Sequence, residues 1–171
     1  ESNTFYYSIG RAQREPTRND MFGGWDDLVA DSTGAGELYI TDPETVWDHE
    51  LGWRMYKKKF YSVFNLYYMS FKNEIVLNGQ FGPNGLALNS NVDQSYRTGV
   101  ELTLVYEPIK ALSFTNNSSF NYSQITQSNT TFHPILTPQL IINQEVVYRL
   151  SGFETGLSMR YQSSSFIDFA N

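Results

Sequence analysis

The sequence predicts an all-β fold, an antiparallel up-and-down meander of about seven long strands that forms part of a transmembrane β-barrel. Three observations support this prediction: apolar and polar residues alternate over long stretches, the predicted strands are long, and the connections between them are alternately short and long. The run YRTGVELTLVYEP, residues 96–108, shows the alternation, with only Thr98 and Val105 out of step. Its apolar positions are Tyr96, Val100, Leu102, Leu104 and Tyr106. Such alternation indicates a strand with one apolar and one polar face.

The same alternation recurs along the chain, and no stretch shows convincing helical spacing. Each predicted strand has about 12 residues and a length of about 40 Å, roughly twice that of a usual globular strand. Strands of this length cross a bilayer at a tilt and project beyond it. The predicted strands are roughly 3–14, 46–57, 60–72, 96–107, 112–124, 138–150 and 153–164.

The connections predict which end of the sheet faces outward. Strict alternation of short and long connections in a meander places every short turn at one end and every long loop at the other. Outer-membrane barrels have this asymmetry, with short periplasmic turns and long extracellular loops. The short connections are 58–59, 107–111 and 151–152, and the long ones are about 15–45, 73–95 and 125–137, with the glycine-rich GQFGPNG, 79–85, expected at a loop tip.

Hairpin geometry gives an independent check on the two faces. A two-residue turn at 151–152 sets apolar Leu150 opposite Phe153 and places the ion pair of Arg149 and Glu154 on the other face. A turn at 58–59 likewise pairs apolar residues, namely Trp53 with Phe64 and Leu51 with Leu66.

Two residues do not fit the assigned faces. Asn116 and Ser118 fall on the apolar side of strand 112–124, between Phe114 and Phe120. A bulge and a shallow placement in the membrane are both open explanations.

Composition narrows the function. The net charge of -6 argues against a nucleic-acid partner. The mean hydropathy is -0.41 and no apolar run approaches the length of a spanning helix. The absence of cysteine excludes disulfides and thiolate metal sites, and the aromatic content of 16% favours β structure. No signal peptide is visible at the start, so an exported protein is expected to be represented by its mature form or by an internal piece.

Seven strands of a meander are not expected to close by themselves. Every backbone polar group of a membrane-spanning sheet must be paired, so open edges are not tolerated in lipid. Residues 1–171 are therefore expected to form a single partial barrel domain, which is a fragment of a larger barrel.

The sequence contains no convergent catalytic constellation, so we expect neither an enzyme nor a cofactor. His49, on the apolar side of a strand, is expected to be an interfacial residue rather than a metal ligand. His133, which precedes Pro134, is expected to be a solvated loop residue. No Gly-x-Ser-x-Gly nucleophile elbow is present, and residues 79–85 lack the lysine of a phosphate-binding loop.

Four stretches resemble the TonB-dependent outer-membrane receptors, and their order and spacing agree over nearly the whole chain. YYSIGRAQREPTRNDMF resembles the family's ascending strand followed by an Arg-x-Pro-Thr segment. TDPETVWDHELGWRMYKKKFYSVFNLYYMSFKNEIVLNG resembles its Pro-Glu, Glu-Leu-Gly, aromatic-Tyr and Ile-Val-Leu sequence. NSNVDQSYRTGVELTLVYEP is similar to its Tyr-Arg-x-Gly-Val-Glu strand, and PILTPQLIINQEVVYRLSGFETGLSMRYQSS to a hairpin a few strands before its C-terminus.

This resemblance implies a barrel of about 22 strands with a plugged lumen, of which the chain would cover about strands 13 to 19. It implies import of a scarce small-molecule ligand (ferric siderophore, haem, cobalamin or oligosaccharide) with energy from the inner-membrane TonB complex. The implied partners are the outer-membrane bilayer, an N-terminal plug domain and the TonB complex, with the plug and the closing strands outside this chain. Two alternatives stay open: a non-energised barrel such as a porin or adhesin, and a soluble secreted β-domain.

Candidate ligand contacts lie in the predicted extracellular loops, where aromatic rings and carboxylates occur together, although ordinary solvated charge is the alternative explanation for the acidic residues. These candidates are Trp25, Asp26, Asp27, Tyr39 and Phe81. Charged residues on the polar faces are expected to bond to a plug, to form a cross-strand charge network, or to do both. They are Glu50, Arg54, Glu101, Arg149, Glu154 and Arg160.

Overall fold

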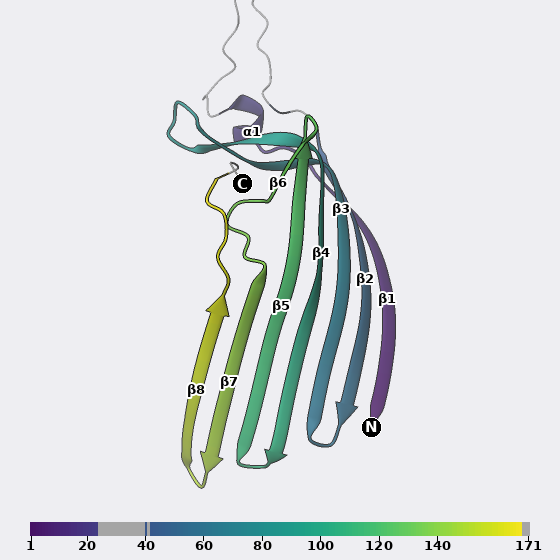
Figure 1. The fold of residues 1–171 in the computed structure, drawn as a ribbon, viewed down its shortest axis with the longest axis vertical. Coiled ribbons are helices and arrows are strands. Elements are labelled where there is room, and N and C mark those ends of the chain that lie inside the picture. The colour runs from purple at the N-terminus through teal and green to yellow at the C-terminus, as the bar shows by residue number, and fades with distance from the viewer. Residues whose placement is uncertain (24–39, 41, 169–171) are drawn as a thin grey trace, which may run out of the picture.

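A computed structural model describes residues 1–23, 40 and 42–168, which form one antiparallel sheet of eight strands (Figure 1). The strands follow chain order across the sheet, β1-β2-β3-β4-β5-β7-β8, with the short β6 paired to β5. The predicted all-β meander of seven long strands is confirmed. The elements are β1 (Ser2–Arg14), α1 (Arg18–Phe22), β2 (Glu44–Lys57), β3 (Phe60–Phe81), β4 (Ala87–Ile109), β5 (Leu112–Gln127), β6 (Thr130–Phe132), β7 (Leu140–Leu150) and β8 (Phe153–Gln162).

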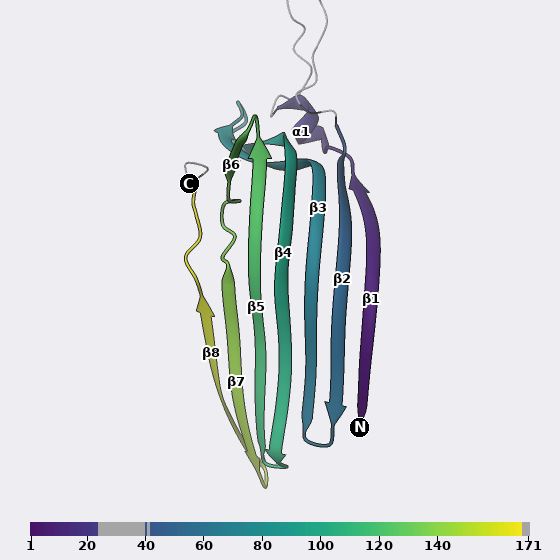
Figure 2. The same ribbon diagram turned by 45° about the vertical axis from the view of Figure 1, so that its right-hand side comes forward.

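The register keeps one set of faces across the sheet, whose strands lie side by side in Figure 2. Residues that pair across antiparallel strands point to the same side. The predicted pairs Trp53 with Phe64 and Leu51 with Leu66 are confirmed, and so is Leu150 with Phe153. One face of the sheet is therefore apolar and the other polar from β1 to β8.

The turn between β7 and β8 explains the precision of its register. Ser151 and Gly152 both have positive φ, at 39° and 88°, which is the geometry of a type I′ hairpin turn that matches the strand twist. Directly beyond it, Arg149 Nε donates to Glu154 Oε2 over 2.7 Å on the polar face.

The apolar face is largely uncovered. Phe5 and Leu157 are 73% and 74% exposed on this face. The described residues that form a buried apolar core lie near the end of the sheet opposite the short turns: Ile40, Phe71, Ile75, Val92 and Ile125. Because burial of apolar surface drives folding, a sheet with this exposed face requires an apolar medium or partner on that side.

Two rows of aromatic residues cross the apolar face. One row contains Tyr68, which stacks on Tyr96 at 6.1 Å, and the other contains Phe60 paired with Tyr106. The rows are eight residues apart on β3 and ten on β4. That spacing is about 26–33 Å along a strand, or a height of roughly 19–27 Å at the usual barrel tilt. The lipid-facing band of an outer-membrane barrel, about 25 Å tall between aromatic girdles, has the same dimension.

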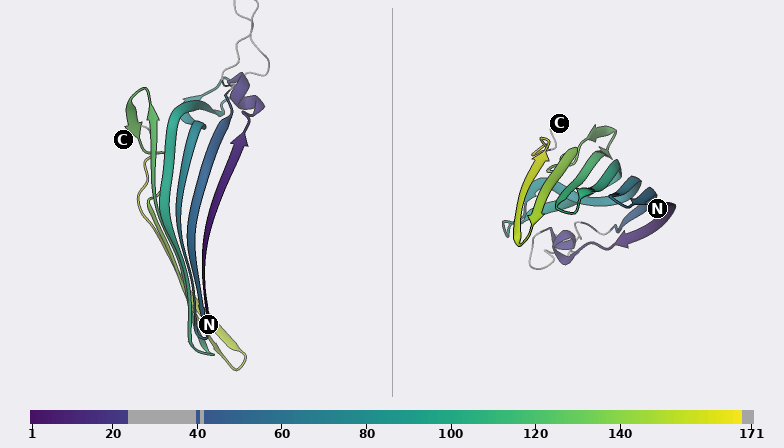
Figure 3. Two further views of the ribbon diagram at one scale, coloured as in Figure 1. Left: turned by 90° about the vertical axis from the view of Figure 1, so that its right-hand side faces the viewer. Right: turned by 90° about the horizontal axis from the view of Figure 1, so that it is seen from below.

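The prediction of a long loop at 73–95 was wrong. β3 and β4 extend through most of this range as paired strands, and only residues 82–86 connect them. The outer part of this hairpin bends across the end of the sheet (Figures 1 and 3), on the side toward which the sheet curves. The turn after β4 is likewise shorter than predicted, because β4 runs to Ile109. The third long loop, 125–137, contains the end of β5 and the small strand β6.

The sequence shows no helical spacing, and the structure adds one short helix, α1, to the all-β fold. Thr17 caps α1 and forms a reciprocal capping box with Asp20, and Gly23 ends the helix at φ 57°. These local bonds satisfy free backbone groups without any apolar periodicity, which is why the periodicity of the sequence gives no sign of α1. Within the described residues, no helix has the length and apolar character needed to span a membrane.

A bulge does not explain Asn116 and Ser118. The β4–β5 register is continuous from Gln94 to Tyr106, and it places Asn116 opposite Leu104. The two polar side chains bond to each other instead, with Asn116 Nδ2 and Ser118 Oγ 3.0 Å apart. On the exposed face they lie opposite Leu104 and Leu102 of β4 and opposite Gln144 and Ile142 of β7.

Candidate functional site

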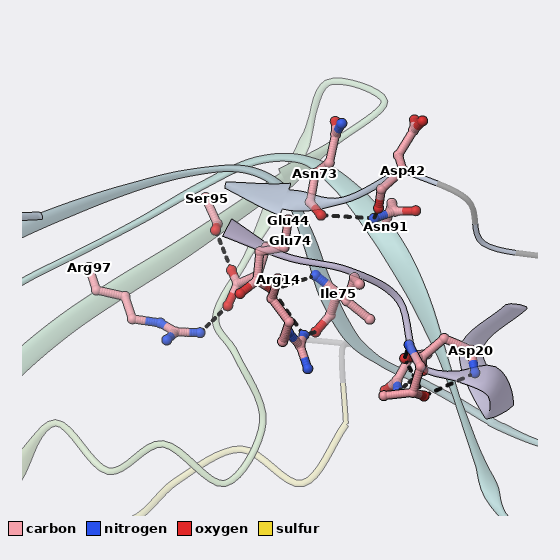
Figure 4. A network of polar contacts seen from close by, with 12 residues as sticks. Arg14, Asp20, Asp42, Glu44, Asn73, Glu74, Ile75, Asn91, Ser95 and Arg97 are labelled. Atoms are coloured by element: carbon pink, nitrogen blue, oxygen red, sulfur yellow. Dashed lines mark hydrogen bonds and ion pairs between the residues drawn. The ribbon is translucent and has the colours of Figure 1, made fainter. Parts of the chain in front are cut away.

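The bend in β3 begins at Asn73, which has a φ of 54° in the left-handed region. Asn91 on β4 holds the bend: its Nδ2 donates to the Asn73 carbonyl over 2.8 Å and to the Asp42 carbonyl over 3.1 Å. Figure 4 shows this cluster of polar contacts. Asparagine adopts the left-handed region more readily than most residues, so the chain can turn here without a glycine.

Past the bend, Glu74 points to the polar face and is only 4% exposed. It accepts hydrogen bonds from Ser95 Oγ and from the Arg97 guanidinium (Figure 4). Arg97 also lies over the Phe71 ring, with its Cζ 4.7 Å from the ring centroid. A buried carboxylate is stable only when it is paired and hydrogen-bonded, and Glu74 is both.

An ion pair on β1 and β2 holds the next residue by its backbone. Arg14 Nη2 and Glu44 Oε2 lie 3.0 Å apart. Glu44 Oε2 accepts from the Ile75 N–H over 2.9 Å, and the Arg14 guanidinium donates to the Ile75 carbonyl over 3.2 Å. One ion pair thus satisfies both backbone groups of Ile75, in the place of a neighbouring strand.

The helix α1 holds the hairpin at a further point. Asp20, 3% exposed, accepts from Asn89 Nδ2 over 2.7 Å and from the Thr17 hydroxyl over 2.7 Å. Burial alone would raise the pKa of the Asp20 carboxyl. The hydrogen bonds from Asn89 and Thr17, together with the positive charge of Arg14, outweigh it and lower the pKa below the ordinary value of 3.8.

These contacts, which we call the hairpin latch (Arg14, Asp20, Glu44, Glu74, Asn89, Asn91, Ser95 and Arg97), hold the β3–β4 hairpin over one end of the polar face. Near the tip of the hairpin, Phe81 is 74% exposed. Aromatic surface beside a few placed polar groups is suited to binding a small ligand. Among the described residues, no three His, Asp or Glu side chains are grouped closely enough to hold a metal ion.

Below the latch, two tyrosines lie across glycines on the polar face. A Cβ at Gly52 would approach the Tyr6 ring to 2.0 Å, and one at Gly99 would approach the Tyr67 hydroxyl to 2.5 Å. Tyr6 also donates to Asn65 Oδ1 over 3.3 Å. Each ring lies flat against its paired strand, as in aromatic rescue of glycine in designed sheets. Tyr6 and Tyr67 therefore cover the backbone at Gly52 and Gly99 on the polar face below the hairpin.

The predicted ligand contacts Trp25, Asp26, Asp27 and Tyr39 lie outside the described residues. Phe81 lies on β3 close to the hairpin tip, as the loop-tip prediction for 79–85 implies. The six predicted lumen-facing charges share the polar face of the sheet, where Arg149 and Glu154 pair with each other. In the described part of the chain, no ion pair joins the other four, which are Glu50, Arg54, Glu101 and Arg160.

The two histidines have partners. The Tyr7 hydroxyl lies 2.7 Å from His49 Nδ1 on the apolar face. His133 is not simply solvated as expected: its Nδ1 is 2.8 Å from the Ser123 carbonyl, and its ring stacks on Phe166 at 5.5 Å. Its position beside Pro134 favours a loop but does not indicate these contacts.

Sequence reasoning missed the latch. The alternation after Lys72 breaks at Asn73, and this break was a signal of a bend rather than of a loop. The pairing of Glu44 and Arg14 with Ile75 spans more than 30 residues and left no local signal.

The comparisons with known proteins match this architecture. The family model for the TonB-dependent receptor-like β-barrel matches residues 1–171. A search of curated proteins finds no match.

Solved structures with the same fold include the copper transporter OprC, with a TM-score of 0.72 and 18% identity over 92% of this chain and 23% of that one. The siderophore receptor PirA from Acinetobacter baumannii has a TM-score of 0.68 and 15% identity, over 95% of this chain and 28% of that one. The FrpB iron transporter from Neisseria meningitidis has a TM-score of 0.66 and 18% identity, over 95% and 25%. The chain spans about a quarter of the length of these structures. By its family match and its fold, the chain belongs to the TonB-dependent receptors and contributes to their β-barrel.

Proposed function

We propose that this chain is the barrel segment of an energised importer in the outer membrane, which takes up a scarce small-molecule ligand with energy from the TonB complex. The observation that carries the proposal is the family match over residues 1–171. The exposed apolar face between two aromatic rows supports the membrane location, since lipid would cover that face. The polar face would then line the lumen and meet the plug.

In this proposal the β3–β4 hairpin is one wall of the outer ligand mouth. It is held over the lumen end by the hairpin latch and carries Phe81 near its tip. The loop predicted for about 15–45, with Trp25, Asp26, Asp27 and Tyr39, would supply further aromatic and acidic contacts. Binding energy at such a mouth comes from aromatic surface and a few placed charges.

The ligand class is proposed by similarity. Two structures with this fold are a siderophore receptor and an iron transporter by name, and a third is a copper transporter. We propose a metal chelate or another scarce nutrient too large for passive pores, with ferric siderophores as the first ligands to test.

Uptake measurements test the energised mechanism. Cells that carry the intact protein should accumulate a radiolabelled ferric siderophore with saturable kinetics, and uptake should stop when the TonB complex is deleted. Uptake that persists without the complex and rises linearly with ligand concentration would identify a passive pore instead.

A loop deletion tests the proposed mouth. Removing residues 24–37 should weaken ligand binding and leave the barrel inserted, since loops tolerate change better than paired strands. Replacing Phe81 with Ala should also weaken binding. The control is Leu136→Ala, because Leu136 is an apolar residue outside the hairpin with a similar exposure, 68% against 74%. Unchanged binding in both the deletion and Phe81→Ala would remove this mouth from the proposal.

A further inference from the structure

A groove on the apolar side of the sheet contains an unusual concentration of positive charge. It has a volume of about 640 Å³ and lies beside the aromatic row that contains Tyr68 and Tyr96, at the end of the sheet where the hairpin bends. Its lining includes Arg11 and Lys72 and none of the described acidic residues. This contrasts with the chain as a whole, whose net charge is -6.

The register places both cations on the outward face. Arg11 pairs with Trp47, which pairs with Ser70. Lys72 pairs with Thr45 on β2 and with Gln94 on β4. The two cations are thus two strands apart, roughly 10 Å across the sheet, and their long side chains can converge on a group held above β2.

An aromatic ring in the floor of the groove holds the Arg11 side chain in place. The Arg11 guanidinium lies over the Trp47 ring with its Cζ 5.8 Å from the ring centroid, within the range of a cation–π contact. Tyr68 and Tyr96 continue the floor as a stacked pair. Aromatic rings at this height take the position of a membrane–water interface, with apolar residues below them and the cations beside and above them.

We propose that this groove binds the phosphorylated headgroup of an outer-leaflet lipid. The phosphate would sit between Arg11 and Lys72, whose charges attract it and donate hydrogen bonds. The polar side chains of Ser70, Thr45 and Gln94 would contact the remaining headgroup atoms, and the acyl chains would run down the apolar face past the tyrosines. The inference goes beyond import and rests only on the membrane placement proposed above.

The occupant is a lipid rather than a soluble anion because the groove opens onto the face that would meet lipid. A free phosphate would gain from the two cations alone, whereas a phospholipid also covers the aromatic floor and the apolar residues beneath it. Binding should therefore need both the phosphate and the acyl chains.

The test uses the intact protein in a non-ionic detergent, titrated by calorimetry with dioctanoyl phosphatidic acid. Dioctanoylglycerol, which lacks the phosphate, and inorganic phosphate, which lacks the chains, are titrated in parallel. The double variant Arg11→Gln/Lys72→Gln should bind phosphatidic acid about thirtyfold more weakly, from the usual contribution of two surface cations. The variant Lys57→Gln/Lys58→Gln removes the same charge at the opposite end of the sheet and should bind as the wild type does. Circular dichroism confirms that each variant is folded.

Four results would overturn the proposal. Equal weakening in both double variants would mean that any surface cation serves. Inorganic phosphate that binds as tightly as phosphatidic acid would identify a soluble-anion site. Dioctanoylglycerol that binds as tightly would leave only an aromatic girdle and no headgroup site, while supporting the membrane placement. Binding of neither lipid to the wild type would mean that the groove holds no headgroup, whereas the membrane placement is tested separately by label accessibility in vesicles.

Discussion

At the scale of single residues, Gly99 has no room for a side chain. A Cβ there would lie 2.4 Å from the backbone oxygen of Phe120, which cannot move without disturbing the β4–β5 pairing. Gly99→Ala should lower the free energy of unfolding by about 1–3 kcal/mol, the usual cost of overpacking. Gly156→Ala is the control, because its Cβ would meet neighbours at an ordinary 3.6 Å. Urea unfolding of the intact protein in detergent measures both, and equal losses would contradict the close approach at Gly99.

Neighbouring residues on opposite faces of β4 give a second prediction at this scale. Leu102 lies on the apolar face and Thr103 on the polar face. Leu102→Arg should destabilise the protein in lipid vesicles by about 2–4 kcal/mol if it lies near the bilayer midplane. Thr103→Arg should cost little, because its charge would enter an aqueous lumen. Folding titrations into vesicles measure the free energy of unfolding of both variants. A larger loss of stability in the Thr103 variant would mean that the two faces are assigned the wrong way round.

Single residues also show where sequence reasoning succeeds and fails. The pairs around the short turns could be predicted because a two-residue turn fixes register and the alternation fixes the faces. The positions of Asn73 and Glu74 could not be predicted in this way, because the left-handed backbone at Asn73 changes the direction of the strand beyond it. The latch joins Arg14 and Glu44 to Ile75 by contacts between distant segments, and a linear pattern carries no record of such contacts. Candidates in 24–39 stay predictions.

At the scale of elements, the hairpin is held by the side chains of the latch, and removal of one of them should loosen it. Arg14→Ala removes the guanidinium donor of the Ile75 carbonyl and the cation that pairs with Glu44. A spin label at Phe81 should become more mobile in this variant. Arg11→Ala, on the same strand but on the opposite face, is the control. Equal label mobility in both variants would show that the ion pair does not restrain the hairpin.

The contact between α1 and β4 should depend on pH. The pKa of the Asp20 carboxyl is lowered in the folded protein. Its contribution to stability is therefore complete well above the ordinary pKa of 3.8 and is lost as the pH falls through the lower pKa of the folded protein. The distribution of distances between spin labels at Met21 and Ala87 should therefore be broader at pH 3 than at pH 7.

The variant Asp20→Asn separates this effect from the titration of other groups. With no charge at this position, it should show the weaker contact at both pH values. If the distance distribution broadens by the same amount between pH 7 and pH 3 in the wild type and in Asp20→Asn, Asp20 is not the group that responds to pH.

At the scale of the whole molecule, the sheet has an uncovered apolar face and two edge strands, β1 and β8, within the described residues. Exposed edges and large apolar surfaces lead to aggregation. Residues 1–171 expressed alone without detergent should therefore aggregate. Sedimentation and thermal unfolding monitor this outcome, and a soluble monomer with a sharp cooperative melt would contradict it.

The central claim is that lipid covers the apolar face while water fills the space on the polar face. Because the chain has no cysteine, single cysteines in it can carry spin labels at defined positions. In the intact protein in vesicles, with any cysteine elsewhere replaced, labels at Val100, Leu102, Leu104, Leu157 and Met159 should collide with oxygen dissolved in lipid. Labels at Glu101 and Arg160 should collide with a water-soluble nickel reagent. The reverse pattern, or equal access of the aqueous reagent to both sets, would contradict a membrane barrel.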